Sequence, residues 1–280
     1  MSDSDVHESF LTVSGYRYLK IASVILIAAT AAYVLAPDPG EPHGGTWQGY
    51  GLGGVAGAIL LFLSWFGIRR RRYATSVVPL RTWMSAHVYL GLALIPIALL
   101  HSDGDLAFNF HGLFFFIVLG AVVTGLVGLL FYVRNPPLIA SNRGGMQLDT
   151  MISEISGIDQ DLRALASKLP NEVNQHLRTA EAETAISTRR GGAVNTQSTA
   201  AARAKSAIET LDLPGYSPHL LSATRKAVSL LVRKDVLVQR ARREVRLRTQ
   251  LRVWLFLHVP FAVAAVAGLA VHVFSVFFYW

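Results

Sequence analysis

The 280-residue chain contains no cysteine. This absence excludes disulfide bonds, iron–sulfur clusters held by cysteine, and haem attached covalently through a Cys-x-x-Cys-His motif. Charged residues are also scarce, at 16% of the chain, whereas 52% of the residues are hydrophobic and the mean hydropathy is +0.39. Soluble globular domains carry about 25% charged residues. The composition therefore indicates a polytopic membrane protein rather than a soluble domain.

Positive charge is concentrated in some connecting segments and missing from others. The net charge of +8 alone could suggest nucleic-acid binding, but the Lys and Arg residues flank apolar segments. Residues 37–49 and 102–111 contain neither Lys nor Arg. This asymmetry is typical of cytoplasmic loop charge in a membrane protein, so membrane lipid is the expected partner and nucleic acid is not.

Five apolar segments reach or approach the roughly 20 residues that a transmembrane helix requires. They are residues 17–36, 50–68, 84–101, 112–133 and 253–279. Lys and Arg precede the first, third and fifth segments and follow the second and fourth. The positive-inside rule therefore predicts a protein of the cell (inner) membrane with a cytoplasmic N-terminus, a cytoplasmic 134–251 region and an extracytoplasmic C-terminus.

One motif occurs in both the third and the fifth apolar segment. It reads Arg-x-Trp-x-x-x-His, then thirteen residues, then a second His. The two copies are Arg81, Trp83, His87 and His101, and Arg252, Trp254, His258 and His272. Fourteen residues of helix advance about 21 Å and return to nearly the same face. Because both segments run outward, His87 and His258 should share a cytoplasmic depth. His101 and His272 should share the opposite depth.

The four histidines point to metal or cofactor chemistry inside the membrane. Facing imidazoles are the axial ligands that a six-coordinate haem iron needs. Ionisable groups in hydrocarbon are costly and mark functional sites. Each histidine alone could instead form a hydrogen bond to a neighbouring helix. Four at matched spacing, with matching Arg and Trp residues, favour ligation.

At these residues the chain resembles the di-haem transmembrane cytochromes b, a grouping that includes the b561-like and ferric-reductase-like membrane domains. The resemblance covers the apolar segments only. It implies two haem b groups in a helical bundle, one held by His87 and His258 and the other by His101 and His272. The fold class expected is an all-α membrane protein, with five transmembrane helices in a haem-binding bundle and a cytoplasmic helical hairpin between helices four and five.

The flanking residues of the motif have two interpretations each. Arg81 and Arg252 could pair with haem propionates at the cytoplasmic rim, or be ordinary positive-inside charges. Trp83 and Trp254 could pack on a haem or belong to an interfacial aromatic belt. His111, at the start of the fourth segment, is interpreted as a solvated helix-end residue, with contact to a propionate or a quinone as the alternative.

Glycines are frequent in the second and fourth apolar segments. They include Gly51, Gly53, Gly54, Gly57, Gly120, Gly125 and Gly128. Small residues allow helices to approach closely, and they equally allow a flat macrocycle to lie against backbone. Close helix packing is the commoner cause.

The polar insert divides the chain into residues 1–140 with four transmembrane helices, 141–250 with a cytoplasmic helical hairpin, and 251–280 with the fifth. Apolar residues recur at intervals of three to four residues from Leu148 to Leu169, which predicts an amphipathic helix ending before Pro170. The other expected features are helix over 171–186, a turn or mobile segment over 187–204, and a helix over 219–250 that can continue into the fifth span. The insert lacks a Gly-rich phosphate loop and is interpreted as a docking or assembly element. Its arginine-rich end either binds anionic lipid headgroups or is a plain positive-inside flank.

The expected function is electron transfer across the membrane by a di-haem cytochrome b subunit of a larger redox complex. The partners would be a quinone pool or cytoplasmic protein on one side and an extracytoplasmic protein, such as a multihaem c-type cytochrome or an iron–sulfur protein, on the other. A quinone site at a haem edge is left open, no catalytic residue is assigned, and enzyme activity of the chain itself stays open. The alternatives are a free-standing transmembrane reductase of ferric iron or another small acceptor, and a His-based proton or metal transporter or signalling protein.

Overall fold

The computed structural model describes residues 10–35, 46–71, 79–106, 109–183, 206, 208 and 217–279. Within this part of the chain the regular secondary structure is entirely α-helical. The all-α prediction is therefore confirmed. The segment 187–204, expected to be a turn or mobile, lies outside the described residues.

Five of the described helices are long and apolar enough to cross a membrane. They are α1 (Val13–Val34), α2 (Trp47–Arg71), α3 (Leu80–His101), α4 (Phe110–Arg143) and α8 (Pro218–Tyr279). The expected segments 50–68, 84–101, 112–133 and 253–279 lie within α2, α3, α4 and α8, whereas α1 covers the expected segment 17–36 only as far as Val34. These helices identify an integral membrane protein.

Backbone geometry explains where two of these helices begin and end. Ser14, Gly15 and Tyr16 have positive φ values of 50°, 62° and 61°, so regular α1 helix begins near residue 17. The extended residue Pro79 (φ −57°, ψ 143°) precedes α3. After α3, Asp103 and Gly104 take positive φ values of 53° and 70°, which turns the chain out of the helix.

The chain divides into two compact units. The membrane unit comprises Met1–Leu130 and Val253–Trp280, and the insert unit comprises Phe131–Arg252. The boundaries fall inside α4 and α8, so both helices contribute residues to each unit. The sequence placed the first boundary at residue 140 and the second at residue 250.

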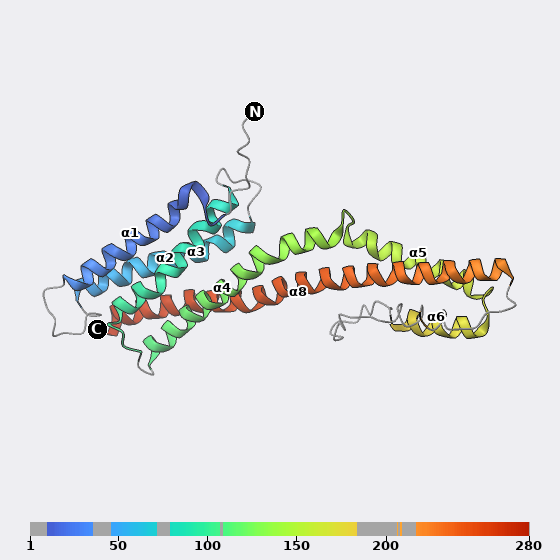
Figure 1. Ribbon diagram of the computed structural model, residues 1–280. Coiled ribbons are helices and arrows are strands. Elements are labelled where there is room, and N and C mark those ends of the chain that lie inside the picture. Colours follow the sequence, from blue (N-terminus) through green and yellow to red (C-terminus); the bar gives the residue numbers. More distant parts are fainter. Residues whose placement is uncertain are drawn as a thin grey trace, which may run out of the picture. The chain divides into compact units, whose positions relative to one another are not determined.

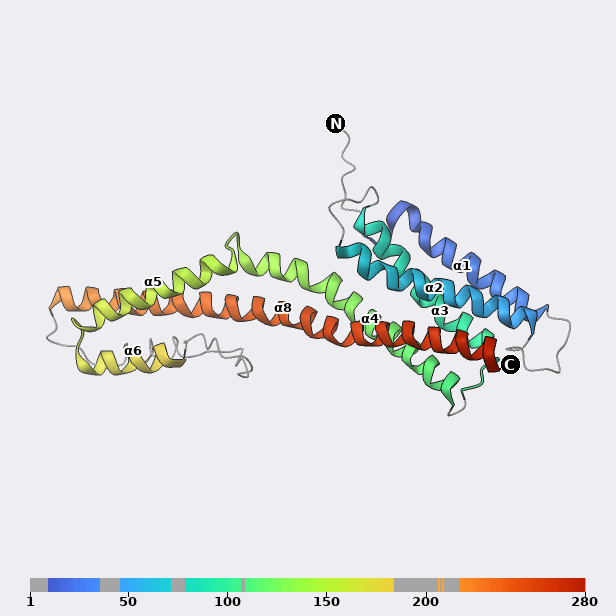
Figure 2. The ribbon, with the colours of Figure 1, turned by 180° about the vertical axis from the view of Figure 1, so that it is seen from behind.

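In the membrane unit, α1, α2 and α3 lie side by side (Figures 1 and 2). The buried residues at their contacts, together with residues of α4 and α8, are mostly small or aliphatic: Ala22, Ala29, Leu52, Ile59, Leu60, Ala93, Leu94, Ile97, Val118 and Ala265. Large apolar side chains face outward, for example Val24 (65% exposed) and Phe256 (79%). Outward apolar groups of this kind suit a lipid environment.

Helices α4 and α8 pack in antiparallel register within the membrane unit, and glycines mark their closest contacts. A Cβ at Gly120 would lie 2.6 Å from Phe261, one at Gly268 would lie 2.6 Å from Phe114, and one at Gly128 would overlap the indole of Trp254. Residues later in α4 thus contact residues earlier in α8. The glycines therefore make room for aromatic side chains, which is the close-packing interpretation of their frequency.

The insert unit contains α5 (Leu148–Ala166), α6 (Asn171–Glu183) and the N-terminal part of α8, which lie beside one another in both views (Figures 1 and 2). Their shared core includes Met151, Ile155, Ile158, Leu162, Val173, Leu177, Leu231 and Val238. Helix α8 is unbroken from residue 218 to residue 279, as the sequence allowed. Helix α5 ends three residues earlier than predicted, where the Asn174 side chain donates to the Ala166 carbonyl at 2.6 Å.

Helix α4 extends ten residues beyond the predicted span, through Pro136 and Pro137 to Arg143. Two asparagine side chains hold this extension against α8. The Asn135 amide donates to the Leu247 carbonyl at 3.0 Å, and the Asn142 amide donates to the Arg240 carbonyl at 2.7 Å. Tertiary hydrogen bonds thus maintain helix across a Pro-Pro pair that would end it in isolation.

Two fully buried charged side chains of the insert unit form ion pairs. Lys234, 1% exposed, lies 2.7 Å from Asp159. Glu244, with no exposed side-chain area, lies 2.7 Å from Arg143 and 2.6 Å from Arg248. The hydrogen bond from Arg143 is the main cause that lowers the pKa of Glu244 below its ordinary value.

Candidate functional site

Helices α3 and α8 bring the four motif histidines together as two pairs. The ring centres of His87 and His258 are 6.5 Å apart, with 75° between their planes. Those of His101 and His272 are 6.0 Å apart, with 89° between their planes. We call these the inner and outer histidine pairs, after the depths that the positive-inside rule predicts for them. Their composition is the one expected from the two depths in the sequence.

The inner pair is surrounded by aromatic and polar side chains from three helices. Phe66 of α2 lies 4.9 Å from His87, measured between ring centres. Trp254 stacks on His258 at 5.7 Å and 22°, and its indole N–H donates to the Thr124 carbonyl at 2.7 Å. The Thr124 hydroxyl oxygen is 3.1 Å from Nδ1 of His258. Helix α4 therefore contacts both the histidine and the tryptophan of the second motif copy.

In the outer pair, His101 packs against two glycines of α2. Nδ1 of His101 lies 2.8 Å from the Gly49 carbonyl oxygen. A Cβ at Gly53, one helical turn later, would lie 2.7 Å from Cε1 of His101, so the ring fits there only because residue 53 is glycine. On the other side of the pair, Phe114 stacks on His272 at 5.7 Å and 28°.

Two of the hydrogen bonds identify the ring nitrogen that carries the proton. A carbonyl oxygen only accepts, so Nδ1 of His101 donates to Gly49. The Thr124 hydroxyl lies 2.7 Å from the Gly120 carbonyl, to which it donates. Its single hydrogen is thus used, and it accepts from Nδ1 of His258. In both rings the lone pair is then on Nε2, which is the tautomer in which Nε2 can bind a metal.

The other two rings differ at Nδ1. Nδ1 of His87 and Nδ1 of His272 are buried and have no hydrogen-bond partner among the described residues. His111 is exposed, as a helix-start residue should be, yet its ring centre is only 4.8 Å from that of His272. A third imidazole therefore borders the outer pair, although the sequence favoured a solvated role for it.

The separation within each pair matches the requirement of one shared metal ion. A metal–imidazole bond is roughly 2 Å long and the bonded nitrogen is roughly 1 Å from its ring centre, so rings on opposite sides of one metal have centres roughly 6 Å apart. Among the described residues no group of three or more His, Asp or Glu side chains could hold a metal ion. Each pair can therefore supply two nitrogens and no more, which is too few for a structural zinc site. Two axial nitrogens do suffice for haem iron, because the porphyrin provides the other four.

The remaining motif residues are less closely involved. Trp83 stacks on Phe62 of α2 at 5.3 Å and 18°, so it joins α3 to α2. Arg81 and Arg252 are exposed, which is compatible with either of their two interpretations. Trp254 stacks on His258 of its own motif copy.

The sequence did not identify Thr124 or the Gly49 carbonyl as parts of the site. A threonine in an apolar helix commonly bonds its own backbone, so Thr124 carried no distinguishing signal. A backbone carbonyl carries none at all. Gly53 was one of several glycines that the sequence suited either to close helix packing or, as the less common cause, to a flat macrocycle.

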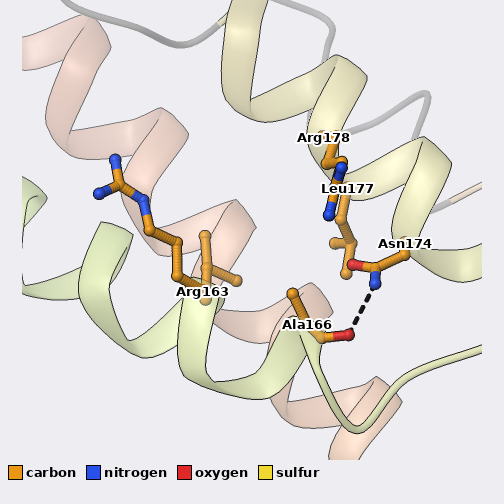
Figure 3. A pocket seen from close by; sticks show the side chains of 6 residues that line it. Arg163, Ala166, Asn174, Leu177 and Arg178 are labelled. Carbon is orange, nitrogen blue, oxygen red and sulfur yellow. Dashed lines mark hydrogen bonds between the residues drawn. The ribbon is translucent and has the colours of Figure 1, made fainter.

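A separate pocket of about 230 Å³ lies in the insert unit between α5 and α6 (Figure 3). Its lining residues are Leu162, Arg163, Ala166, Asn174, Leu177 and Arg178. It contains no histidine and no carboxylate. The Asn174 amide bonds the end of α5 there, so these contacts fix the turn between the two helices.

No protein-family model matches the chain, and no curated protein or solved structure is similar to it at a significant level. The function must therefore be argued from the histidine pairs themselves.

Proposed function

We propose that this protein carries electrons across a membrane through two b-type haems, one at the inner and one at the outer histidine pair. The observation that supports the proposal is the matched separation of 6.5 Å and 6.0 Å between the paired rings. A direct hydrogen bond between two imidazoles, with about 3 Å between the nitrogens, would bring the ring centres to within roughly 5 Å of each other, which is closer than either pair. The tautomer of His101 and His258, with the proton on Nδ1 and the lone pair on Nε2, supports it further.

The side chains of the two pairs have defined tasks in this proposal. The two imidazoles of each pair would hold one haem iron between them, which would favour outer-sphere electron transfer over oxygen binding. The haems would supply the one-electron chemistry. The chain provides the ligands, excludes water with Phe66, Trp254 and Phe114, and orients His101 and His258 through their Nδ1 hydrogen bonds.

Two haems along the bundle axis would divide the insulating layer into shorter steps. Fourteen residues separate the histidines on each helix, which corresponds to about 21 Å. An electron that crosses the full membrane gains or loses about 2.3 kcal/mol per 100 mV of membrane potential. The potentials of the partners would therefore set the direction of flow.

The partners we propose are a quinone pool or cytoplasmic protein on the inner side, and an extracytoplasmic protein such as a multihaem c-type cytochrome or an iron–sulfur protein on the outer side. The N-terminus and the insert unit would be cytoplasmic, and the insert unit would contribute docking or assembly contacts. The chain then works as an electron-transfer subunit of a larger complex.

The decisive experiment is a reduced-minus-oxidised absorbance spectrum with a haem-to-protein ratio on purified protein. We expect two haems per chain. Single substitutions His87→Ala, His258→Ala, His101→Ala and His272→Ala should each remove about one haem. His176→Ala and His219→Ala, in the insert unit, are matched controls that should keep both.

Other outcomes would lead to other functions. Colourless wild-type protein would contradict the proposal and favour a transporter or signalling role for the histidines. A ratio of one would contradict the pairing. If the purified chain alone transfers electrons from quinol to ferric iron, it is a free-standing reductase rather than a subunit.

A further inference from the structure

The histidine of the inner pair that lies on α8 has a polar partner on a different helix. His258 shares a hydrogen bond of 3.1 Å with the Thr124 hydroxyl of α4. That hydroxyl is itself fixed, because it donates to the Gly120 carbonyl at 2.7 Å and lies 3.0 Å from the Ala121 carbonyl. Thr124 is thus held as an acceptor facing the ring.

The surrounding contacts leave the ring little freedom to rotate away from Thr124. Trp254 covers one face of His258 and is bonded to the Thr124 carbonyl. A Cβ at Gly125 would be 3.4 Å from Cε1 of His258, so α4 backbone lies against the ring edge. One residue of α4, Thr124, therefore binds the histidine through its hydroxyl and the tryptophan through its carbonyl.

We infer that Thr124 is a positioning residue that sets both the orientation and the donor strength of His258 toward the inner haem iron; this inference rests on the proposed function. A hydrogen bond from Nδ1 of a ligating imidazole makes the ring a stronger electron donor. A stronger donor favours ferric over ferrous iron. Loss of the hydroxyl should therefore raise the reduction potential of the inner haem and leave the outer haem unchanged.

The test is a potentiometric titration of the full-length purified protein, in which the two haems give two transitions. Thr124→Val keeps the shape of the side chain and removes the hydroxyl. We expect the reduction potential of one transition to rise by about 59 mV, which corresponds to a tenfold change in the ferric-to-ferrous ratio of a one-electron couple. Thr124→Ser restores the acceptor and should return that transition to the wild-type value.

Thr30→Val on α1 is the matched control, because the Thr30 hydroxyl also bonds its own helix, at 2.9 Å to the Leu26 carbonyl. It should leave both transitions in place. Should Thr124→Val retain only one haem, rescue by Thr124→Ser would support the inference, and failure of that rescue would overturn it.

Two results separate this inference from the proposed function. Two haems with unshifted transitions in Thr124→Val would overturn the role of Thr124 while the di-haem proposal stands. Wild-type protein without haem would overturn both. A shift of both transitions by the same amount would also contradict the inference, because Thr124 contacts the inner pair alone.

Discussion

Gly128 of α4 offers a sharp test of the packing around the inner histidine pair. An alanine Cβ at this position would overlap the indole of Trp254. The overlap involves ring atoms in a side chain that is stacked on His258, so the indole must move as a whole. Gly125 provides the control on the same helix, because an alanine Cβ there would be 3.4 Å from His258.

Opposing effects decide the sign of each substitution. Replacing glycine by alanine inside a helix stabilises it by up to about 1 kcal/mol. At Gly128 the overpacking costs about 1–3 kcal/mol, and loss of the Trp254 hydrogen bond costs about 0.5–1.5 kcal/mol more. Gly128→Ala should therefore be destabilising by roughly 1–3 kcal/mol. Gly125→Ala should be neutral or slightly stabilising.

The measurement is thermal unfolding in detergent, followed by loss of the monodisperse protein peak. This readout does not depend on haem. A change of 1 kcal/mol corresponds to roughly 2–4 °C for a chain of this size class, so Gly128→Ala should melt several degrees below the wild type and Gly125→Ala at or above it. Equal melting temperatures for the two variants would refute the reasoning, since the helix-propensity term is the same in both.

Two further predictions concern the insert unit and the topology. Asp159→Asn leaves the ammonium of Lys234, 1% exposed, without its partner and should destabilise the unit by about 3–5 kcal/mol. Lys234→Met leaves a partly solvated carboxylate and should cost less. Denaturant unfolding compares the two variants, and equal losses of stability would contradict the argument. Since the chain has no cysteine, single cysteines at Ser153 and Asp105 report topology directly. A membrane-impermeant maleimide added to intact cells should label Asp105→Cys and not Ser153→Cys, and the reverse pattern would invert the orientation.

The membrane helices could be predicted from the sequence because length and hydropathy are local properties. A run of apolar residues long enough to cross a bilayer is helical in any arrangement, since its backbone groups have no water to bond. The histidine pairs were predictable for a related reason: a spacing of fourteen residues places two side chains on one helical face. The repeat of that spacing in a second parallel segment implied matching depths.

The contributions of α4 were not predictable in this way. Its extension to Arg143 depends on hydrogen bonds from Asn135 and Asn142 to carbonyls about a hundred residues away. The bond between Thr124 and His258 depends on the register between two helices that are far apart in sequence. Such contacts follow from tertiary packing, and neither propensity nor periodicity carries that information.

The difference between the two units follows from the solvent that each is suited to. In lipid, apolar burial does not drive helices together, so association relies on close contact at small residues and on hydrogen bonds between helices. The membrane unit has both, at Gly120, Gly128 and Gly268 and in the bonds that Trp254 and His101 make to neighbouring backbone. The insert unit instead buries an aliphatic core and pairs its buried charges. For this reason a methyl group added at one of these three glycines should be disruptive, while in the insert unit the sensitive change is removal of one partner of an ion pair.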